Sequence, residues 1–387
     1  MAELSPERQE FARSVRDWVD STWPKQRALE SEKREYQFPF DLWDEMTEAG
    51  FHAVGIDEEY GGAGGTPVDT AILARELSRN LGGLAWAWSI SSFAGARAIG
   101  LAGTHEQKKQ YLSMLAAGQC RFAIAVTEPS GGTDLLGAMR TAARQTATGW
   151  LLNGQKTWCT GAKEADYLLL LAKTGDPAPG RRHPQTTLFL VPTDRQGLDF
   201  RYIPKLGMRA IGSCEIFLDE VEIEPDLVLG EVGNGFKALV AALNNERILS
   251  AAMALGMLEG VLEEALAYVL QRETFGRVIG ARQAVQHYIA DIAMWRKQSE
   301  LLTFDVAARE EAGLPCAIDA LIAKVATSEY AVQAADLGIQ MLGGMGLSTE
   351  THMQRYWRDL RQFRVAPINN EVARSSIAES LGLPRAY

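Results

Sequence analysis

The order of patterns along the chain restricts its fold more than any other feature. Apolar residues recur at helical spacing up to about residue 120, and a glycine-rich break, YGGAGGTP, interrupts them at 60–67. Short apolar runs separated by turns then follow, as in strands, until GEVGNGF at 230–236. Helical spacing returns beyond that point. The chain is therefore predicted to be an α+β multidomain protein, with an N-terminal α-helical domain at 1–120, a middle β domain at 121–230 and a C-terminal α-helical bundle at 231–387.

Three local patterns give more detailed expectations. The long helices of the C-terminal bundle are expected at roughly 236–272, 281–311 and 316–342. In the β domain, Asn153-Gly154 within GWLLNGQKTWC is a typical hairpin signal. In the N-terminal domain, the uncharged stretch LGGLAWAWSISSFAGA at 81–96 is shorter than a membrane span and lies between Arg79 and Arg97. We therefore predict a buried helix there and no contact with a membrane.

Composition excludes several classes of function. The chain has 387 residues, 47% hydrophobic and 23% charged, so it can bury a large core. Its formal net charge of -10 argues against a general nucleic-acid-binding protein, because nothing neutralises a run of phosphates. The four cysteines form no CxxC pair and the five histidines show no HxxxH spacing, so neither a metal site nor a disulfide framework is indicated. The N-terminal stretch MAELSPERQEFARSV is unlike a secretory signal, and we expect a cytoplasmic protein.

The stretch FAIAVTEPSGGTD, at 122–134, lies at the first of the predicted domain boundaries. Gly and Pro punctuate ordinary turns, so the stretch alone is compatible with a simple connection between domains. Clefts between domains are also where ligands bind. Its glycines allow a ligand to approach the backbone closely, and Thr127 and Thr133 offer hydroxyl groups to polar atoms. Both interpretations remain open on this stretch alone.

Four segments, in this order, resemble the signature blocks of the acyl-CoA dehydrogenase family: FAIAVTEPSGGTD, NGQKTWCTGA, RETFGRVIGARQ and QMLGGMG. One block would be weak evidence, whereas four in register are strong. The resemblance extends over nearly the whole chain. It implies a β-barrel-like middle domain between the N-terminal helical domain and a C-terminal four-helix domain. It also implies FAD as cofactor and a homotetramer.

The resemblance implies a division of the FAD contacts among these blocks. The isoalloxazine half would meet the first two blocks, where Trp158 packs beside the ring and Thr160 donates a hydrogen bond to its N5 edge. Without the neighbouring blocks, a half-buried strand aromatic would be the favoured interpretation of Trp158, and Gly343-Gly344 could simply be a helix C-cap. Thr133 would also lie near the pantetheine-phosphate part of a CoA thioester. The implied cofactor residues are Ile124, Val126, Thr127, Gly132, Thr133, Trp158 and Thr160, then Arg272, Thr274, Phe275 and Gln283 of one subunit with Gln340, Gly343 and Gly344 of another, and Asn369 and Glu371.

The implied reaction is α,β-dehydrogenation of an acyl-CoA, in which a carboxylate removes the α-proton and flavin N5 accepts the β-hydrogen as hydride. Many members carry the base as the glutamate of a YEGT segment, but here that stretch reads VAPIN, with Pro367 at the position of the base. Others, of the isovaleryl-CoA dehydrogenase type, carry it on a C-terminal-domain helix. The matching segment is LNNERILSA, which assigns the base to Glu246 and a substrate contact to Arg247.

Two further points concern this assignment. A glutamate in a long helix more often faces water, but the nearly uncharged run ILSAAMALG beyond Glu246 predicts burial, which would raise the pKa of this carboxyl. Pro367 has no N–H to donate to the thioester carbonyl, as the family backbone does at this position. The family's usual electron acceptor is electron-transfer flavoprotein. Activity on a carrier-bound acyl group, a desulfinase or oxidase reaction, and a non-catalytic flavoprotein are the alternatives.

Overall fold

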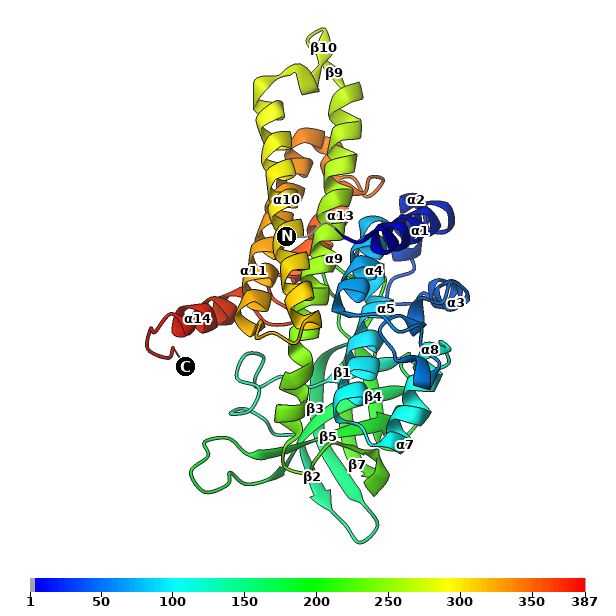
Figure 1. Ribbon diagram of the computed structural model, residues 1–387, viewed down its shortest axis with the longest axis vertical. Helices are drawn as coiled ribbons and strands as arrows, with labels where there is room; N and C mark the ends of the chain where they lie inside the picture. Colours follow the sequence, from blue (N-terminus) through cyan, green and yellow to red (C-terminus); the bar gives the residue numbers. More distant parts are fainter. Residues whose placement is uncertain (1–3, 387) are drawn as a thin grey trace.

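The computed structural model describes residues 4–386, with the side chain of Leu243 left out. Figure 1 shows an elongated molecule in which long helices fill the upper half, the sheet lies below, and shorter N-terminal helices run along one side. This arrangement confirms the predicted order of helical, β and helical parts. The N-terminal helical elements are α1 (Pro6–Thr22), α2 (Lys25–Glu32), α3 (Phe40–Glu48), η1 (Phe51–Ala53), η2 (Glu58–Tyr60), α4 (Pro67–Leu81), η3 (Gly82–Ala85), α5 (Trp86–Ser91), η4 (Ser92–Arg97), α6 (Ala98–Ala102), α7 (His105–Gln107), η5 (Lys108–Leu112) and α8 (Ser113–Ala116).

The uncharged stretch at 81–96 is helical throughout, although its geometry changes along its length. The chain runs through the 3₁₀ turn η3, then α5, the π-helical turn η4 and α6 without a break. Trp88 lies in the core of the helical half, whereas Phe93 and Ile99 lie in the core of the sheet, together with the buried side chains of the strands. The expected buried helix is therefore confirmed, and it connects the two cores. Within residues 4–386, no helix combines the length and the apolar character needed to cross a membrane.

The middle part is an eight-stranded sheet in the order β6-β7-β3-β2-β4-β5-β8, with β1 pairing parallel to β4. The apolar runs of β4 and β5 are fully buried, which explains why they show no polar alternation. The longest strands, β3 and β7, pair antiparallel and reach the helical half. The strands are β1 (Phe122–Ala125), β2 (Ala142–Gln145), β3 (Trp150–Thr160), β4 (Tyr167–Gly175), β5 (Gln185–Pro192), β6 (Leu198–Tyr202), β7 (Ser213–Ile223) and β8 (Val228–Leu229), the last preceded by η6 (Pro225–Leu227).

The hairpin predicted at Asn153-Gly154 is wrong, because both residues lie inside β3. The register with β7 shifts between Leu152 and Gly154, so the glycine marks a bulge. A side chain at Gly154 would collide with Thr141, since a built Cβ lies 2.5 Å from its hydroxyl oxygen. The Asn153 side chain exchanges hydrogen bonds with Glu220 of β7, at 2.7 and 3.0 Å. Long-range contacts thus take the place of the turn that the dipeptide usually forms.

The C-terminal part is built on three long helices that follow one another up and down the bundle (Figure 1). Their observed bounds confirm the predicted ones to within a few residues. A short β-hairpin forms the tip between α9 and α10. The elements are α9 (Gly235–Gln271), β9 (Glu273–Thr274), β10 (Arg277–Val278), η7 (Ile279–Ala281), α10 (Gln283–Glu311), α11 (Ala317–Leu342), α12 (Gly344–Leu347), α13 (Met353–Gln362) and α14 (Asn370–Ser380).

Helix α9 is shared by both hydrophobic cores. Leu239 and Ala242, near its start, pack into the core of the sheet. From Ile248 onward its apolar side chains pack with those of α4 and α11 in the core of the helical half. The residues between these two stretches, including Glu246, therefore lie at the junction of the sheet and the bundle.

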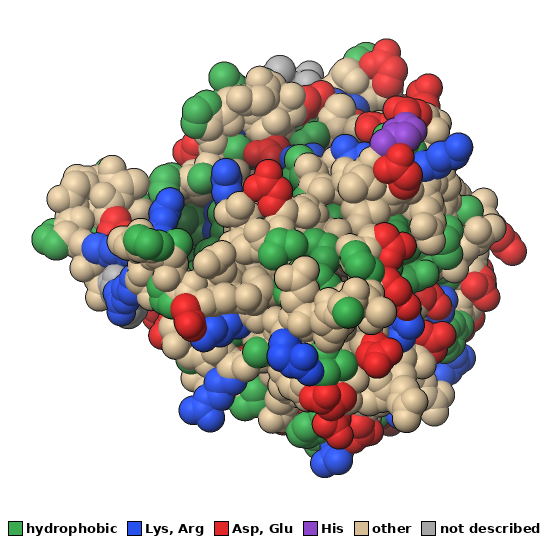
Figure 2. Space-filling model, turned by 90° about the horizontal axis from the view of Figure 1, so that it is seen from below, with side chains coloured by type: hydrophobic (Ala, Val, Ile, Leu, Met, Phe, Trp, Pro, Cys, Tyr) green, Lys and Arg blue, Asp and Glu red, His purple; other side chains and the backbone are tan. Residues whose placement is uncertain are grey.

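The lower end of the molecule carries a mixed surface. Figure 2 shows acidic and basic side chains interspersed over this face, with hydrophobic side chains between them. The net charge of -10 is therefore not gathered into one acidic surface on this side.

Candidate active site

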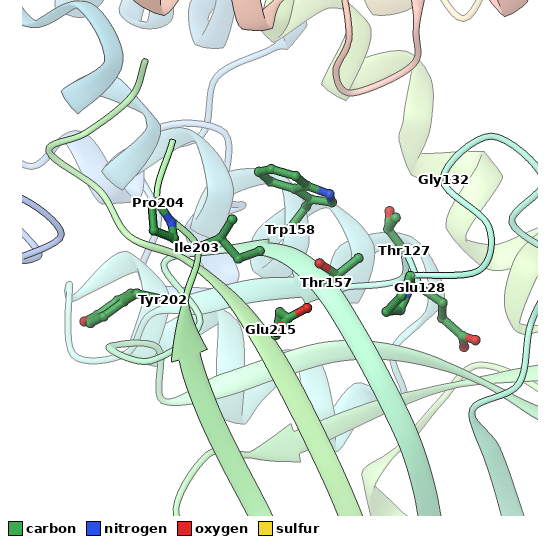
Figure 3. Close-up of a pocket in the computed structure, with 10 residues that line it drawn as sticks. Thr127, Glu128, Gly132, Thr157, Trp158, Tyr202, Ile203, Pro204 and Glu215 are labelled. Atoms are coloured by element: carbon green, nitrogen blue, oxygen red, sulfur yellow. The ribbon is translucent and has the colours of Figure 1, made fainter. Parts of the chain in front are cut away.

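A cavity of about 580 Å³ opens where the first loop after β1 meets β3 and the end of β6. Figure 3 shows the indole ring of Trp158 standing between the Ile203–Pro204 segment and the loop that carries Thr127 and Gly132. The ring is 57% exposed, which is unusual for so large an aromatic side chain. The cavity is lined by Thr127, Glu128, Pro129, Gly132, Thr157, Trp158, Tyr202, Ile203, Pro204 and Glu215.

An irregularity in β3 turns Trp158 toward this cavity. The register with β7 shifts between Lys156 and Cys159, and Trp158 has a φ of 60°, in the left-handed region. Such backbone strain in a non-glycine residue persists only where the surroundings hold it, and it is concentrated at functional sites. The N–H of Thr157 donates to the carbonyl of Thr127 at 2.9 Å, which fastens the strand to the loop.

A buried ion pair supports the loop from below. The Lys156 ammonium donates to the Glu128 carboxylate at 2.8 Å and to the Val126 carbonyl at 3.1 Å. The same carboxylate accepts the backbone N–H groups of Arg140 and Thr141. Burial opposes the ionisation of Glu128, but the charge of Lys156 and these hydrogen bonds outweigh it, so the pKa of Glu128 lies below its ordinary value. The backbone that faces the cavity is thereby held in one conformation.

The C-terminal segment before α14 reaches the same loop. The Asn369 amide donates to the Thr133 hydroxyl at 2.9 Å, while its oxygen accepts the Val372 N–H and caps α14. Lys324 of α11 is buried beneath this segment, where it donates to the Ile368 carbonyl and, at 2.7 Å, to the Asn370 side chain. The segment is thus fastened both to the loop and to the bundle.

Glu246 is half-buried on α9, at the junction of the sheet and the bundle. Burial raises the pKa of its carboxyl to about 7, although the charges of Arg247 and Lys324 act in the opposite direction. Burial also lowers the pKa of the Arg247 guanidinium, which donates to the Asn244 side chain at 3.1 Å. A carboxyl group with this pKa is matched to proton transfer near neutral pH.

The chain does not bring all the sequence-predicted residues together. Arg272, Thr274 and Phe275 lie at the tip of the bundle, where Phe275 is 97% exposed. At a rise of about 1.5 Å per residue, α9 carries the chain about 38 Å from Glu246 to Gln271. Gln340, Gly343 and Gly344 lie toward the same end, since the neighbouring Leu342 carbonyl accepts a hydrogen bond from Tyr268 of α9 at 3.4 Å.

The predicted residues therefore form two groups within one chain. The first group lies toward the sheet and its junction with the bundle: Thr127, Gly132 and Trp158 line the cavity, and the others are Ile124, Val126, Thr133, Thr160, Glu246, Arg247, Asn369 and Glu371. The second group lies toward the tip: Arg272, Thr274, Phe275, Gln283, Gln340, Gly343 and Gly344. The two groups cannot contact one small molecule within a single chain.

The residues of both groups fit the chemistry of a flavin nucleotide. A Cβ built at Gly132, Gly343 or Gly344 meets no atom within 4 Å, so the chain leaves space over these residues. The exposed Trp158 ring offers an apolar face for a flat ring system, and Arg272 offers a guanidinium for a pyrophosphate. The hydroxyl of Thr127 adds a polar contact inside the cavity.

A helical part before the sheet, a helical bundle after it and a cavity beside the loop that follows β1 define a three-part architecture. Sequence profiles of the acyl-CoA dehydrogenase N-terminal, middle and C-terminal domains match residues 5–119, 123–221 and 233–382. The chain belongs to the acyl-CoA dehydrogenase family, whose members are FAD-dependent oxidoreductases that act on acyl-CoA.

Individual proteins agree with this assignment. The probable acyl-CoA dehydrogenase YngJ of Bacillus subtilis is 31% identical over 98% of this chain and 99% of its own length. Butyryl-CoA dehydrogenase from Megasphaera elsdenii superposes with a TM-score of 0.92, at 28% identity over 98% of this chain and 99% of that chain. The FAD complex of PigA superposes with a TM-score of 0.91, at 26% identity over 99% of each chain.

Sequence reasoning missed several residues that organise the site. Lys156 and Glu128 support the loop, and Lys324 holds the C-terminal segment. A lone lysine in the apolar run ALIAKVA was the only local signal for Lys324. The hydroxyl oxygen of Ser213 lies 2.9 Å from that of the predicted residue Thr160. Lys205 in turn donates a hydrogen bond to Ser213 at 2.8 Å. Nothing in the sequence pairs them with it, because the pairing depends on the register of β3 with β7.

Proposed function

We propose that this protein catalyses the FAD-dependent α,β-dehydrogenation of an acyl-CoA to the 2-enoyl-CoA, with Glu246 as the α-proton base. One observation carries the proposal: a carboxyl group with a pKa of about 7 lies on α9 where the sheet and the bundle meet. Family membership supports the reaction class. The alternative position of a base is occupied by Pro367, which has no ionisable group.

Bound FAD would supply the acceptor for the β-hydrogen and its electron pair. Trp158 would flank the flat ring, and the Thr160 hydroxyl would donate to its edge. Gly132 leaves the backbone of the loop open to close approach, and Thr133 is oriented by its hydrogen bond with Asn369. These residues bind and orient both reactants without taking up the proton.

Glu246 would take up the α-proton. Its carboxylate is the reactive form, and the pKa of about 7 leaves a large fraction ionised at neutral pH while keeping the group basic. The cations of Arg247 and Lys324 favour this ionised form. Arg247 also lies beside the base on α9, where its guanidinium can contact the substrate. Pro367 contributes no backbone N–H, so the stabilisation of the thioester oxygen rests on other groups.

We further propose that the FAD site is completed by a second subunit of a homotetramer. This would explain how the tip residues, which lie far from the cavity in one chain, meet the same FAD. We also propose the domain boundaries at 120/121 and 230/231, because short connections precede β1 and α9 there. Electron-transfer flavoprotein is the proposed electron acceptor, and the cytoplasm the proposed location.

Anaerobic titration of the purified holoprotein with saturated acyl-CoAs tests the proposed function. Straight-chain and branched acyl-CoAs are added in turn, and bleaching of the oxidised flavin absorbance is recorded. At least one acyl-CoA is expected to reduce the flavin, with the 2-enoyl-CoA as product. Dithionite serves as the control that the flavin is reducible. If dithionite bleaches the flavin and no acyl-CoA does, the proposed function is wrong.

A further inference from the structure

The arginines of the middle part fall into two sets. Residues 121–230 contain eight arginines. Four of them pair with a carboxylate: Arg121, Arg195, Arg201 and Arg209. Among the residues that the structure describes, the other four guanidinium groups have no carboxylate within ion-pair distance and donate no hydrogen bond, and all four are exposed: Arg140, Arg144, Arg181 and Arg182. These four residues form the basic flank. Their charges are uncompensated, although the chain as a whole has a net charge of -10.

The topology of the sheet brings the basic flank to one side of the molecule. Arg144 lies on β2 and Arg140 just before it. The N–H of Lys173, near the end of β4, donates to the Thr141 carbonyl at 2.9 Å. At about 3.3 Å per residue, β4 ends at Gly175, about 7 Å further on. Arg181 and Arg182 lie on the connection that follows, 176–184, which projects from the sheet on the same side as the loop after β1 (Figure 1).

The connection at 176–184 has few alternative conformations and no free acidic group. Its single acidic residue, Asp176, pairs with Lys173 at 2.9 Å, so it does not neutralise the arginines. Three prolines restrict its backbone, and the Arg181 N–H donates to the Ala178 carbonyl at 2.9 Å in a turn. An anion that binds the two adjacent guanidinium groups therefore has little backbone left to order.

The loop after β1 leads to the basic flank. The Ser130 hydroxyl donates to the Ala138 carbonyl at 3.0 Å, which closes the loop two residues before Arg140. The family resemblance implies that Thr133, on this loop, lies near the pantetheine-phosphate part of a CoA thioester. Beyond pantetheine, CoA continues into a pyrophosphate and then into an adenosine that carries a 3′-phosphate. These anionic groups must leave the reaction centre along the surface, and the uncompensated arginines lie on the side where this loop projects.

We propose that the basic flank binds the nucleotide end of a CoA thioester, with Arg140 at the pyrophosphate and Arg181 and Arg182 at the 3′-phosphate. The inference rests on the proposed function at one point, the entry of a CoA thioester beside Thr133. The planar fork of a guanidinium matches two phosphate oxygens, and Arg140 comes first along the path from Thr133. An acyl group carried on a protein has neither the adenosine nor the 3′-phosphate. The basic flank therefore selects CoA over a carrier protein.

Calorimetric titration of the purified holoprotein with CoA and with dephospho-CoA tests the assignment without turnover. Dephospho-CoA lacks only the 3′-phosphate, so wild type is expected to bind CoA about tenfold more tightly. In the double variant Arg181→Met/Arg182→Met this preference is expected to vanish, while dephospho-CoA keeps its wild-type affinity. Arg140→Met is expected to weaken both ligands by the same factor, because both carry the pyrophosphate.

The controls separate a phosphate contact from a general effect of charge. Arg361→Met removes an exposed arginine on α13 that likewise has no acidic partner among the described residues, and it should bind both ligands as wild type does. Arg181→Lys/Arg182→Lys keeps the charges and is expected to retain part of the preference for CoA. Higher salt should reduce the preference in wild type, since the groups are exposed.

The possible outcomes decide the proposal separately from the proposed function. If wild type binds CoA and dephospho-CoA equally, or binds neither, the proposal is overturned. A double variant Arg181→Met/Arg182→Met that keeps the preference for CoA also overturns it. So does flavin reduction by an acyl-pantetheine as efficient as by the matching acyl-CoA, a result that would favour a carrier-bound substrate. If the affinities change as expected but no acyl-CoA reduces the flavin, the proposed function fails and this inference stands.

Discussion

Glu246 illustrates how one carboxyl group acquires a role from its surroundings. Its neighbours in sequence include Asn244 and Arg247, which would suit an ordinary solvated helix face. Packing at the junction instead withdraws the carboxyl from water and raises its pKa to about 7, while two cations keep the ionised form accessible. Glu128 shows the opposite result, since its ion pair and backbone hydrogen bonds lower its pKa and occupy its oxygens, which makes it a weak base. Environment, not residue type, separates the two glutamates.

Glu246→Gln is expected to slow the reduction of the flavin by acyl-CoA by about 10²-fold or more, because the amide keeps the shape but cannot take up a proton. FAD content and acyl-CoA binding should stay close to wild type. Stopped-flow absorbance of the flavin measures the rate. Glu264→Gln on the same helix, where Glu264 pairs with Lys25 at 2.9 Å, is the control and should keep the wild-type rate. An unaltered rate in Glu246→Gln rules out its role as the base.

The rate of flavin reduction is expected to rise with pH through about 7, since only the ionised Glu246 accepts a proton. Below this pH the rate should fall about tenfold per pH unit, because the carboxylate fraction falls in that proportion. Above it the rate should level off. The same stopped-flow measurement at a series of pH values tests this. A flat profile between pH 5.5 and 8.5 would contradict the assignment.

At the scale of elements, the loop after β1 depends on contacts that come from three directions. The buried Lys156–Glu128 pair fixes its base, Thr157 of β3 fixes its edge, and Asn369 before α14 fixes Thr133. These contacts add to the hydrogen bonds within the loop, such as that from the Ser130 hydroxyl to the Ala138 carbonyl at 3.0 Å. Gly132 in particular has no atom within 4 Å of a built Cβ, so its open side faces the place proposed for FAD.

Gly132→Val is expected to lower FAD affinity about tenfold, or about 1.4 kcal/mol, while leaving the thermal stability of the FAD-free protein unchanged. The Cβ of the new side chain meets no protein atom within 4 Å in the FAD-free chain, so the substitution is expected to obstruct the cofactor. Flavin release on dilution measures affinity, and calorimetry of the FAD-free protein measures stability. Gly100→Val, which is equally open but lies on α6, should keep wild-type affinity. Unchanged FAD affinity in Gly132→Val would place the cofactor elsewhere.

At the scale of the whole molecule, the distance between the cavity and the tip of the bundle bears on whether one chain can form the proposed FAD site. The long α9 keeps Arg272 and Phe275 far from Trp158. Phe275 is exposed and has a left-handed φ of 51°, and such features are typical of binding sites. In the proposed homotetramer, the tip residues of a second copy of the chain would lie beside the cavity of the first. Cofactor binding and assembly would then depend on each other.

Arg272→Ala is expected to weaken FAD binding about tenfold or more, since a guanidinium–pyrophosphate contact is lost. Light scattering coupled to size-exclusion chromatography gives the mass, and the absorbance ratio gives FAD occupancy. Arg277→Ala, an exposed arginine on the same hairpin, is the control and should retain FAD. A wild-type monomer that holds FAD tightly would disprove a site shared between subunits.

The sequence by itself determined the order and type of the elements and the family, because helical and strand periodicity depends on neighbours a few residues apart. The bounds of α9, α10 and α11 and the buried helix at 81–96 follow from such local patterns. Asn153-Gly154 was misread because Glu220 and Thr141, far away in the chain, decide its conformation.

Only the tertiary structure decided which residues meet at the site. It joins Asn369 to Thr133, 236 residues apart, and places the charge of Lys324 beside Glu246. It also links Lys205 to Thr160 through Ser213 and keeps the tip away from the cavity. Hydrogen bonds and pKa values depend on distance and burial in three dimensions, and local periodicity carries no information about either.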